Sequence, residues 1–220
     1  MLNPSKGNMY PFVTHTWNTV KGKCPHDCSY CYMKRFGNQK PTRFDRKELN
    51  VDLGEGNFIF VGSSCDMWAN DIQEKWIQDT LDHCKKYDNK YLYQTKNPER
   101  IYILRSYLPF RSIVGTTIET NRVYPQMGYT PDILNRSWCM NCLSESFKTM
   151  VTVEPIMDFD LTSLTKRILI CNPSWVNIGA DSQGHSLPEP SSEKIQALIG
   201  NLKDSNIEVK LKSNLKRLFT

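Results

Sequence analysis

Three closely spaced cysteines, Cys24, Cys28 and Cys31, are the residues of this 220-residue chain whose type and spacing most directly suggest chemistry. They follow the pattern C-x3-C-x2-C, so three thiolates of one loop can turn toward a single point. An iron–sulfur cluster of the four-iron type normally takes four Cys thiolates. A loop with three cysteines would leave one iron without a protein ligand, and a small molecule could bind there.

Two other kinds of site could use the same cysteines. Short Cys spacings with a nearby histidine, here His26, often bind zinc, but zinc sites usually come as paired C-x2-C knuckles, and the pairing here is uneven. A disulfide framework is disfavoured because three cysteines lie so close together in a chain of this size. The spacing therefore favours a metal cluster, and a zinc-dependent binding module, for instance on DNA, remains the alternative.

The cysteine pattern, with the aromatic Tyr30 just before the third cysteine, closely resembles the signature of the radical S-adenosylmethionine (radical SAM) enzymes. The resemblance implies a [4Fe–4S] cluster held by Cys24, Cys28 and Cys31, with SAM bound at the open iron. It also implies reductive cleavage of SAM to methionine and a 5′-deoxyadenosyl radical, which abstracts a hydrogen atom from a substrate. Such chemistry belongs to the cofactor, and the protein supplies position and a dry pocket.

The composition limits the setting in which this chemistry can occur. A hydrophobic content of 39% is enough for a buried core, and the length suggests one domain, residues 1–220. The net charge of +5 permits an anionic substrate or nucleic acid but does not demand one. The sequence shows neither a signal peptide nor an apolar run of about 18 residues, so we expect a cytoplasmic protein without membrane contact.

Strand-like and helix-like segments alternate along the chain. Apolar and β-branched runs predict strands over residues 10–18, 57–62, 90–96, 111–118, 147–153, 174–180 and, briefly, 207–212. Helices are expected at 32–36 and from caps or starts at Asn70, Asn97, Thr130, Leu161 and Ser191 or Ser192. Alternating strands and helices give a parallel sheet with right-handed crossovers, and six units are too few for a closed eight-fold barrel. We therefore predict an α/β fold, a partial (β/α)6 TIM-like barrel, open on one side, with a short extra C-terminal strand. This is also the core fold that the resemblance implies.

Residues 37–56 are polar and partly basic, and we expect a long loop with little structure of its own. Arg43, Arg46 and Lys47 could meet an anion there, although a solvated connection is the favoured interpretation.

Polar side chains follow nearly every predicted strand. In parallel α/β folds, ligands bind at the carboxyl ends of the strands, so these residues are expected to share one rim. After the cysteine loop, the strand ends carry Ser63, Ser64, Cys65 and Asp66; Gln94, Thr95 and Lys96; Glu119 and Arg122; Glu154; and Asp181 with Ser182.

Over about residues 14–217 the chain resembles a compact, phage-associated family of radical SAM proteins whose substrate is largely unassigned. The matching pieces are Thr16-Trp17-Asn18, the cysteine loop, Val61-Gly62-Ser63 with Asp66, residues 95–100, Gly115 with Glu119, Glu154-Pro155 and residues 179–182. The resemblance implies SAM contacts from Tyr30 and Asp66, from Ser63 and Ser64 at the amino group, from Thr117, Glu119 and Arg122 at the ribose and carboxylate, and from Glu154, Asp181 and Ser182 at the adenine and ribose. Gly62-Ser63-Ser64 departs from the more usual Gly-Gly-Glu.

The positions of the remaining cysteines indicate different roles for them. Cys65 follows the second strand at the rim, and a thiol there could return a hydrogen atom to a substrate radical, as in some lyases of the superfamily. Cys139 and Cys142 lie in a predicted helix with only Cys171 as a plausible companion, so we favour buried core cysteines over a second cluster.

The resemblance also bears on partners. It implies an electron donor such as flavodoxin or ferredoxin and leaves the substrate open; a basic, phage-related protein suggests a nucleotide or nucleic acid. An activase that installs a radical on a partner protein is an alternative. A non-catalytic electron-transfer protein is another, although electron transfer needs no SAM pocket and the rim carboxylates and Arg122 argue against it.

Overall fold

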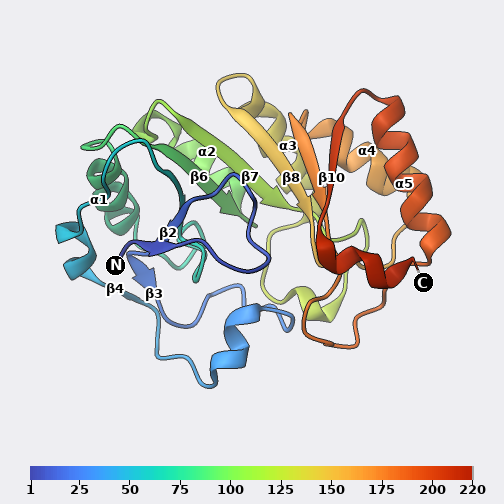
Figure 1. The fold of residues 1–220 in the computed structure, drawn as a ribbon, viewed down its shortest axis with the longest axis horizontal. Helices are drawn as coiled ribbons and strands as arrows, with labels where there is room; N and C mark the ends of the chain where they lie inside the picture. The colour runs from blue at the N-terminus through green and yellow to red at the C-terminus, as the bar shows by residue number, and fades with distance from the viewer. Residues whose placement is uncertain (220) are drawn as a thin grey trace.

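The computed structural model describes residues 1–219 and contains an eight-stranded sheet, flanked by helices, and a small two-stranded ribbon (Figure 1). The strands of the main sheet lie in the order β1 (Asn3–Pro4), β2 (His15–Trp17), β5 (Phe58–Val61), β6 (Lys90–Thr95), β7 (Ser112–Thr117), β8 (Lys148–Val153), β9 (Trp175–Ile178) and β10 (Glu208–Leu211). Every pair from β2 to β10 is parallel, and β1 pairs antiparallel with β2. The predicted partial barrel with a short final strand is confirmed.

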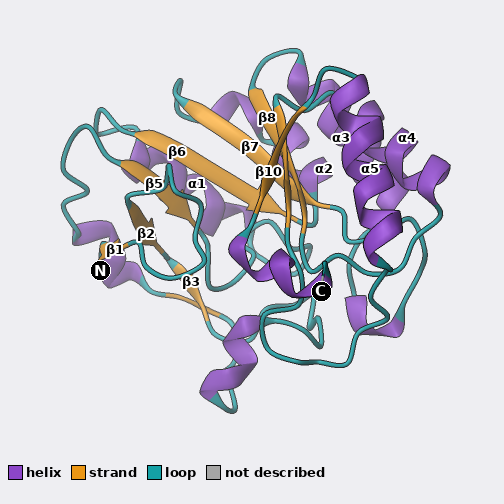
Figure 2. Ribbon diagram, turned by 45° about the vertical axis from the view of Figure 1, so that its right-hand side comes forward, coloured by secondary structure: helices purple, strands orange, loops and turns teal. Residues whose placement is uncertain are grey.

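One α-helix follows each of the strands β5 to β9. These helices are α1 (Glu74–Cys84), α2 (Pro98–Ile103), α3 (Ile133–Ser144), α4 (Leu161–Ile170) and α5 (Ser192–Asp204). They pack on the same face of the sheet, each helix from α2 onward against the next (Figure 2). Pro98 occupies the first helical position of α2, as expected, and the Ser191 side chain caps α5. The expected cap at Asn70 is wrong, because α1 begins after Gln73 and the Asn70 amide oxygen accepts a hydrogen bond from Asn97 instead.

The main apolar core lies between the sheet and these helices. The strands supply alternate residues to it, so that Tyr91 and Tyr93 of β6 face the helices while Leu92 and Gln94 face the other way. Burial of apolar surface on this scale contributes roughly 25 cal/mol per Å² and is the main force that holds the helices on the sheet.

The N-terminal segment fills the opposite, inner face of the sheet. Only His15–Trp17 of the predicted strand 10–18 pairs as a strand, and the residues before it run across the barrel interior. There the side chains of Tyr10 and Val13 pack with Leu92, Met150 and Trp175 in a second apolar cluster. The Tyr10 hydroxyl bonds to Gln94 Oε1 (2.7 Å) and Thr152 Oγ1 (2.8 Å), so it is fully partnered inside the barrel.

The segment that follows the cysteine loop has more structure than expected. β3 (Val20–Lys21) pairs with β4 (Arg43–Phe44), and 3-10 turns form at η1 (Tyr32–Phe36) and η2 (Arg46–Asn50). A buried carboxylate explains part of this order, because Glu48 accepts a hydrogen bond from Trp17 Nε1 (3.1 Å) and pairs with Lys21. Three further 3-10 turns are η3 (Arg105–Tyr107), η4 (Pro125–Met127) and η5 (Ser213–Leu218).

Candidate functional site

The carboxyl ends of the parallel strands open into one cavity of about 920 Å³. Because the strands run the same way, the loops that follow them meet at this rim. The site residues predicted from the sequence that line the cavity are Cys24, Cys28, Tyr30, Cys31, Ser63, Ser64, Cys65, Asp66, Thr117, Glu154, Asp181 and Ser182. Glu119 and Arg122 do not line it.

The cysteine loop is held against η4 by hydrogen bonds between the two segments. The Ser29 N–H donates to Gln126 O (2.9 Å), the Tyr129 N–H donates to His26 O (2.7 Å), and the Cys28 thiol donates to Met127 O (3.2 Å). Gly128 lies at the contact with φ of +66°, and a Cβ there would stand 2.1 Å from His26 O. Only glycine therefore permits this close approach.

The three cysteines of the loop are free thiols on the cavity wall. Burial raises the pKa of Cys28 to about 11 and also raises that of Cys31, while the nearby Lys96 ammonium opposes both shifts. Within residues 1–219, no three His, Cys, Asp or Glu side chains converge tightly enough for a single metal ion; these sulfurs surround open space instead. Three soft sulfur donors around a cavity, with a cation beside them, fit an iron–sulfur cluster.

Cys65 is the fourth thiol of the same wall. It is buried after β5 and is hydrogen-bonded with Cys24, which lowers the pKa of Cys24 to about 7 and raises that of Cys65. The sequence placed Cys65 at the rim, and the structure brings it next to a cysteine of the loop.

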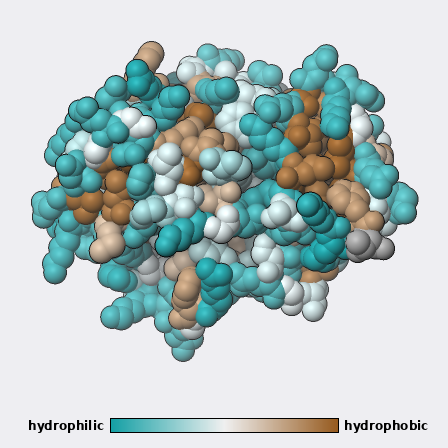
Figure 3. Space-filling view, in the orientation of Figure 1, coloured by the Kyte–Doolittle hydropathy of each residue, from teal (hydrophilic) through white to brown (hydrophobic). Residues whose placement is uncertain are grey.

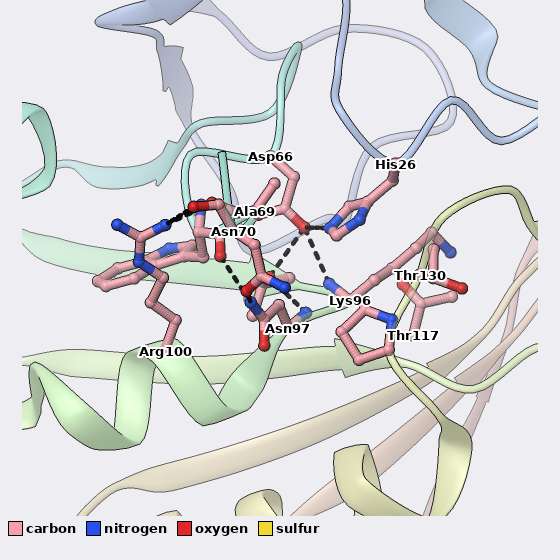
Figure 4. Close-up of polar contacts among 12 residues, drawn as sticks. His26, Asp66, Ala69, Asn70, Lys96, Asn97, Arg100, Thr117 and Thr130 are labelled. Atoms are coloured by element: carbon pink, nitrogen blue, oxygen red, sulfur yellow. Dashed lines mark hydrogen bonds and ion pairs between the residues drawn. The ribbon is translucent and has the colours of Figure 1, made fainter. Parts of the chain in front are cut away.

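Asp66 joins the cysteine loop to the ends of β5 and β6 (Figure 4). Its Oδ2 lies 2.9 Å from His26 Nε2 and accepts hydrogen bonds from Thr95 Oγ1 (2.8 Å) and the Lys96 N–H (2.9 Å). Burial alone would raise the pKa of Asp66, but these donors lower it, so the carboxylate stays charged. Asp66 borders the cavity as expected, but the protein itself satisfies its carboxylate, which points to a positioning role.

Glu119, for which a SAM contact is predicted from the sequence, is buried in an ion-pair network and does not line the cavity. Its side chain is fully enclosed, accepts hydrogen bonds from the Tyr30 hydroxyl and Arg136 Nη1 (3.0 Å), and pairs with Lys96. Burial would raise the pKa of Glu119, yet Lys96 and Arg136 lower it to about 2. Glu119 therefore fixes Lys96 and Tyr30, both of which reach the cavity.

Lys96 is the cavity residue that sequence reasoning noted at a strand end but did not assign. Its ammonium is only 16% exposed and lies 5.2 Å from the centre of the Tyr30 ring. The sequence does contain a signal for Lys96, because a lysine directly after a buried strand is itself partly buried. A partly buried ammonium group needs a carboxylate partner, so such a lysine indicates an ion pair at the site.

Arg122, the other predicted SAM contact that does not line the cavity, forms ion pairs of its own. Its guanidinium pairs with Asp160 (2.6 Å) and with Asp158, both on the loop before α4 and outside the cavity. These two carboxylates are 36 and 38 residues further along the chain, and their proximity cannot be read from local pattern. The Arg122 guanidinium is thus already paired in this structure.

At the far end of the cavity, Glu154 joins the beginning and the end of the chain. It accepts hydrogen bonds from Lys212 Nζ (2.7 Å), Asn214 Nδ2 (2.9 Å) and Asn8 Nδ2 (3.0 Å). Sequence reasoning missed all three partners, because each lies far from Glu154 in the chain.

Asp181 and Ser182 line the cavity beside Glu154, as expected. Asp181 Oδ1 lies 2.7 Å from His185 Nδ1, and burial of Asp181 is outweighed by this contact and by backbone donors, which lower its pKa. Ser182 Oγ accepts a hydrogen bond from Asn214 (2.8 Å). The side chains at this end of the cavity are therefore polar, and their carboxylates have hydrogen-bond or ion-pair partners within the protein.

The other cysteines lie away from the cavity. Cys171 is buried, as predicted, whereas Cys139 and Cys142 of α3 are only half-buried. Within residues 1–219, no helix combines the length and apolarity needed to cross a membrane.

This chain resembles known proteins in its three-dimensional structure but not in its sequence. No protein-family model and no curated protein matches the sequence. Solved structures of spore photoproduct lyase do match: one mutant has a TM-score of 0.66 at 12% identity, covering 93% of this chain and 78% of the other. A complex with dinucleoside spore photoproduct has a TM-score of 0.59, and a mutant with bound AdoMet and the same dinucleoside has 0.58, each at 12% identity over 90% of this chain and 63% of the other. This chain therefore shares with spore photoproduct lyase the fold of a partial TIM-like barrel.

Proposed function

We propose that the protein is a radical SAM enzyme in which Cys24, Cys28 and Cys31 hold a [4Fe–4S] cluster. The observation that carries the proposal is the set of three free thiols around one cavity, at the strand ends of a fold shared with an enzyme solved with bound AdoMet. When bound, the cluster and SAM supply reductive cleavage of SAM to a 5′-deoxyadenosyl radical that abstracts hydrogen from a substrate.

The chain's own residues would position these groups. Lys96, held by Glu119, places a positive charge beside Cys28 and Cys31 and so stabilises their thiolates. The polar wall formed by Ser63, Ser64, Thr117, Glu154, Asp181 and Ser182 remains the proposed SAM-binding surface. Tyr30 contributes its ring to the same wall, because its hydroxyl is turned toward Glu119.

The substrate that we propose is a nucleotide or nucleic acid. The dinucleoside bound in two of the neighbours supports this class, as does the basic net charge. The relation to phage-associated proteins stands on the sequence pieces quoted above. Eight free cysteines suit a reducing, cytoplasmic setting, where flavodoxin or ferredoxin would supply the electron.

The proposal is tested by anaerobic reconstitution with iron and sulfide, reduction, addition of SAM and assay for 5′-deoxyadenosine. We expect about four irons per chain and 5′-deoxyadenosine from the wild type. Cys28→Ala should lose both, whereas Cys142→Ser, which changes a cysteine outside the cavity, should keep both. Four irons without SAM cleavage would favour the electron-transfer alternative, and zinc without cluster absorbance would overturn the proposal.

Cys65 is proposed as the hydrogen donor to a substrate radical, because its thiol lies in the cavity wall beside Cys24. In this step the S–H bond breaks, a C–H bond forms on the substrate, and the unpaired electron remains on sulfur. Once a substrate is known, turnover in D₂O should place deuterium in the product through the exchangeable thiol. Unchanged product and deuterium incorporation in Cys65→Ala would exclude this role.

A further inference from the structure

The net charge of the protein is concentrated around the cysteine loop. Residues 21–50 carry eight Lys and Arg but three Asp and Glu, a net charge of +5 that equals the +5 of the whole chain. The other 190 residues are therefore balanced in charge. Such asymmetry marks the face on which a polyanion would bind.

The few acids of this segment are already neutralised. Asp27 pairs with Lys23 and Lys34, Asp45 pairs with Lys21, and the buried Glu48 pairs with Lys21 and the N-terminus. In the part of the chain that the structure describes, five cations of the segment form no ion pair: Arg35, Lys40, Arg43, Arg46 and Lys47. Their charge is available to a ligand.

Two of these cations, Lys40 and Arg43, line a groove that adjoins the reaction cavity, and Arg35 lines the reaction cavity itself. A second cavity of about 420 Å³ is lined by Lys21, Lys40 and Arg43. It shares part of its wall with the 920 Å³ cavity, namely Gly22, Met33, Asn38, Gln39 and Ser64. On the other side of this shared wall, Lys23, Lys34 and Arg35 line the mouth of the larger cavity. Cationic side chains of the segment thus line both of the adjoining cavities.

Two exposed aromatic rings line the same two cavities. Tyr32 and Phe36 of η1 are 41% and 61% exposed; Tyr32 lines the larger cavity and Phe36 the smaller one. The Arg35 guanidinium lies 4.7 Å from the Phe36 ring centre and 5.8 Å from that of Tyr32. The part of the molecule that protrudes at the bottom of Figure 1, where this segment lies, is covered mainly by hydrophilic side chains with a few apolar ones among them (Figure 3).

We propose that residues 21–50 form a binding track for single-stranded nucleic acid, which leads a nucleotide from the groove into the reaction cavity. Cations along a groove follow a phosphate backbone, and exposed rings beside them stack on bases, the combination typical of single-strand binding. A duplex would keep its base faces covered, so the rings of Tyr32 and Phe36 favour an unpaired strand. The proposal rests on the proposed function for the chemistry at the end of the track, but the binding itself does not need that chemistry.

The track is tested by fluorescence anisotropy with labelled single strands of about 15 nucleotides, one of DNA and one of RNA, on the reconstituted protein without SAM. The Lys40→Gln/Arg43→Gln double variant should raise the Kd about tenfold. It should also reduce the slope of log K against log salt by about 1.4, because each phosphate contact to a single strand contributes about 0.7. The matched control is Lys166→Gln/Lys203→Gln, which removes two exposed cations of α4 and α5 on the opposite side of the molecule (Figure 1).

Stacking is tested separately from charge. Phe36→Ala should raise the Kd about fivefold or more with an unchanged salt slope, whereas Phe110→Ala, which removes a 99% exposed ring elsewhere, should have no effect. Circular-dichroism melts confirm that each variant is folded. Tighter binding of the RNA or of the DNA strand identifies the source of the phosphate backbone.

Three results would overturn the track: no binding by the wild type, equal loss of affinity in the α4/α5 control, or equal competition by a duplex or by polyglutamate. The outcome is separable from that of the proposed function. Binding of a single-stranded nucleic acid without SAM cleavage would support the track and contradict the proposed radical chemistry. SAM cleavage without binding of a single strand would contradict the track alone.

Discussion

At the scale of single residues, the site depends on a buried carboxylate that never reaches the cavity. Glu119 lies between Lys96 and Arg136 and receives the Tyr30 hydroxyl, so three side chains take their positions from it. A buried charge is tolerated only when paired, and here one carboxylate pairs with two cations. The arrangement directs Lys96 toward the cysteines.

We predict that Glu119→Gln destabilises the protein by about 3–5 kcal/mol, because it removes the carboxylate that pairs with the buried Arg136 and with Lys96. Denaturant unfolding measures the change. Glu55→Gln, which alters an exposed acid without an ion pair, should stay within about 0.5 kcal/mol of wild type. Equal midpoints for Glu119→Gln and wild type would show that the network is not held by this residue.

The same residue predicts a pH dependence. Because the pKa of Glu119 falls from 4.5 to about 2 on folding, its stabilisation is fully present above pH 4.5 and is lost as the pH falls through 2. Wild-type stability measured between these pH values should therefore decline more steeply than that of Glu119→Gln. Parallel curves would contradict the lowered pKa.

At the scale of elements, the position of the cysteine loop depends on its contact with η4. The contact is made through backbone atoms, and Gly128 lies where any side chain would meet His26 O. A loop held in this way keeps three thiols on one wall although it has little regular structure.

We predict that Gly128→Ala lowers the iron bound per chain after reconstitution, because the added Cβ pushes the loop away from η4. Gly56→Ala is the matched control: Gly56 has a similar φ of +71°, but a Cβ there would meet nothing within 4 Å. Both variants place an alanine at a positive φ, but only Gly128→Ala adds a clash with His26 O. Equal iron content in the two variants would contradict the role of this contact.

The strand ends, and with them most of the site, were readable from sequence. Parallel strands end at one rim, so a polar residue after a buried run is placed correctly without any knowledge of its contacts, as for Cys65, Asp66 and Asp181. The surroundings of Arg122 and Glu119 could not be predicted in this way, because ion-pair partners elsewhere in the chain determine them. The prediction of a strand before His15 was wrong, because an extended segment that fills the inside of a barrel has the same apolar pattern as a strand.

At the scale of the whole molecule, the two ends of the chain meet inside the open barrel. Lys212, just after β10, pairs with Glu154 (2.7 Å) and lies 4.8 Å from the centre of the Tyr10 ring. Lys210 of β10 likewise lies 5.9 Å from the Phe12 ring centre. The N-terminal segment thereby supplies the packing that a closed barrel would obtain from further strands. It also brings Asn8 and Tyr10 into the cavity wall.

Phe12 tests this closure because its ring lies between the first segment of the chain and the sheet, with ring centres 5.0 Å from Phe58 and 5.5 Å from Trp175. Phe12→Ala removes a half-buried ring, so we expect a loss of about 2 kcal/mol, below the value for a fully buried phenylalanine. For a chain of this length the thermal midpoint should fall by about 4–8 °C. Phe110→Ala removes a 99% exposed ring and should leave the midpoint unchanged. If the two variants melt together, the N-terminal segment is not part of the cooperative structure, and the barrel is held by the sheet and its outer helices alone.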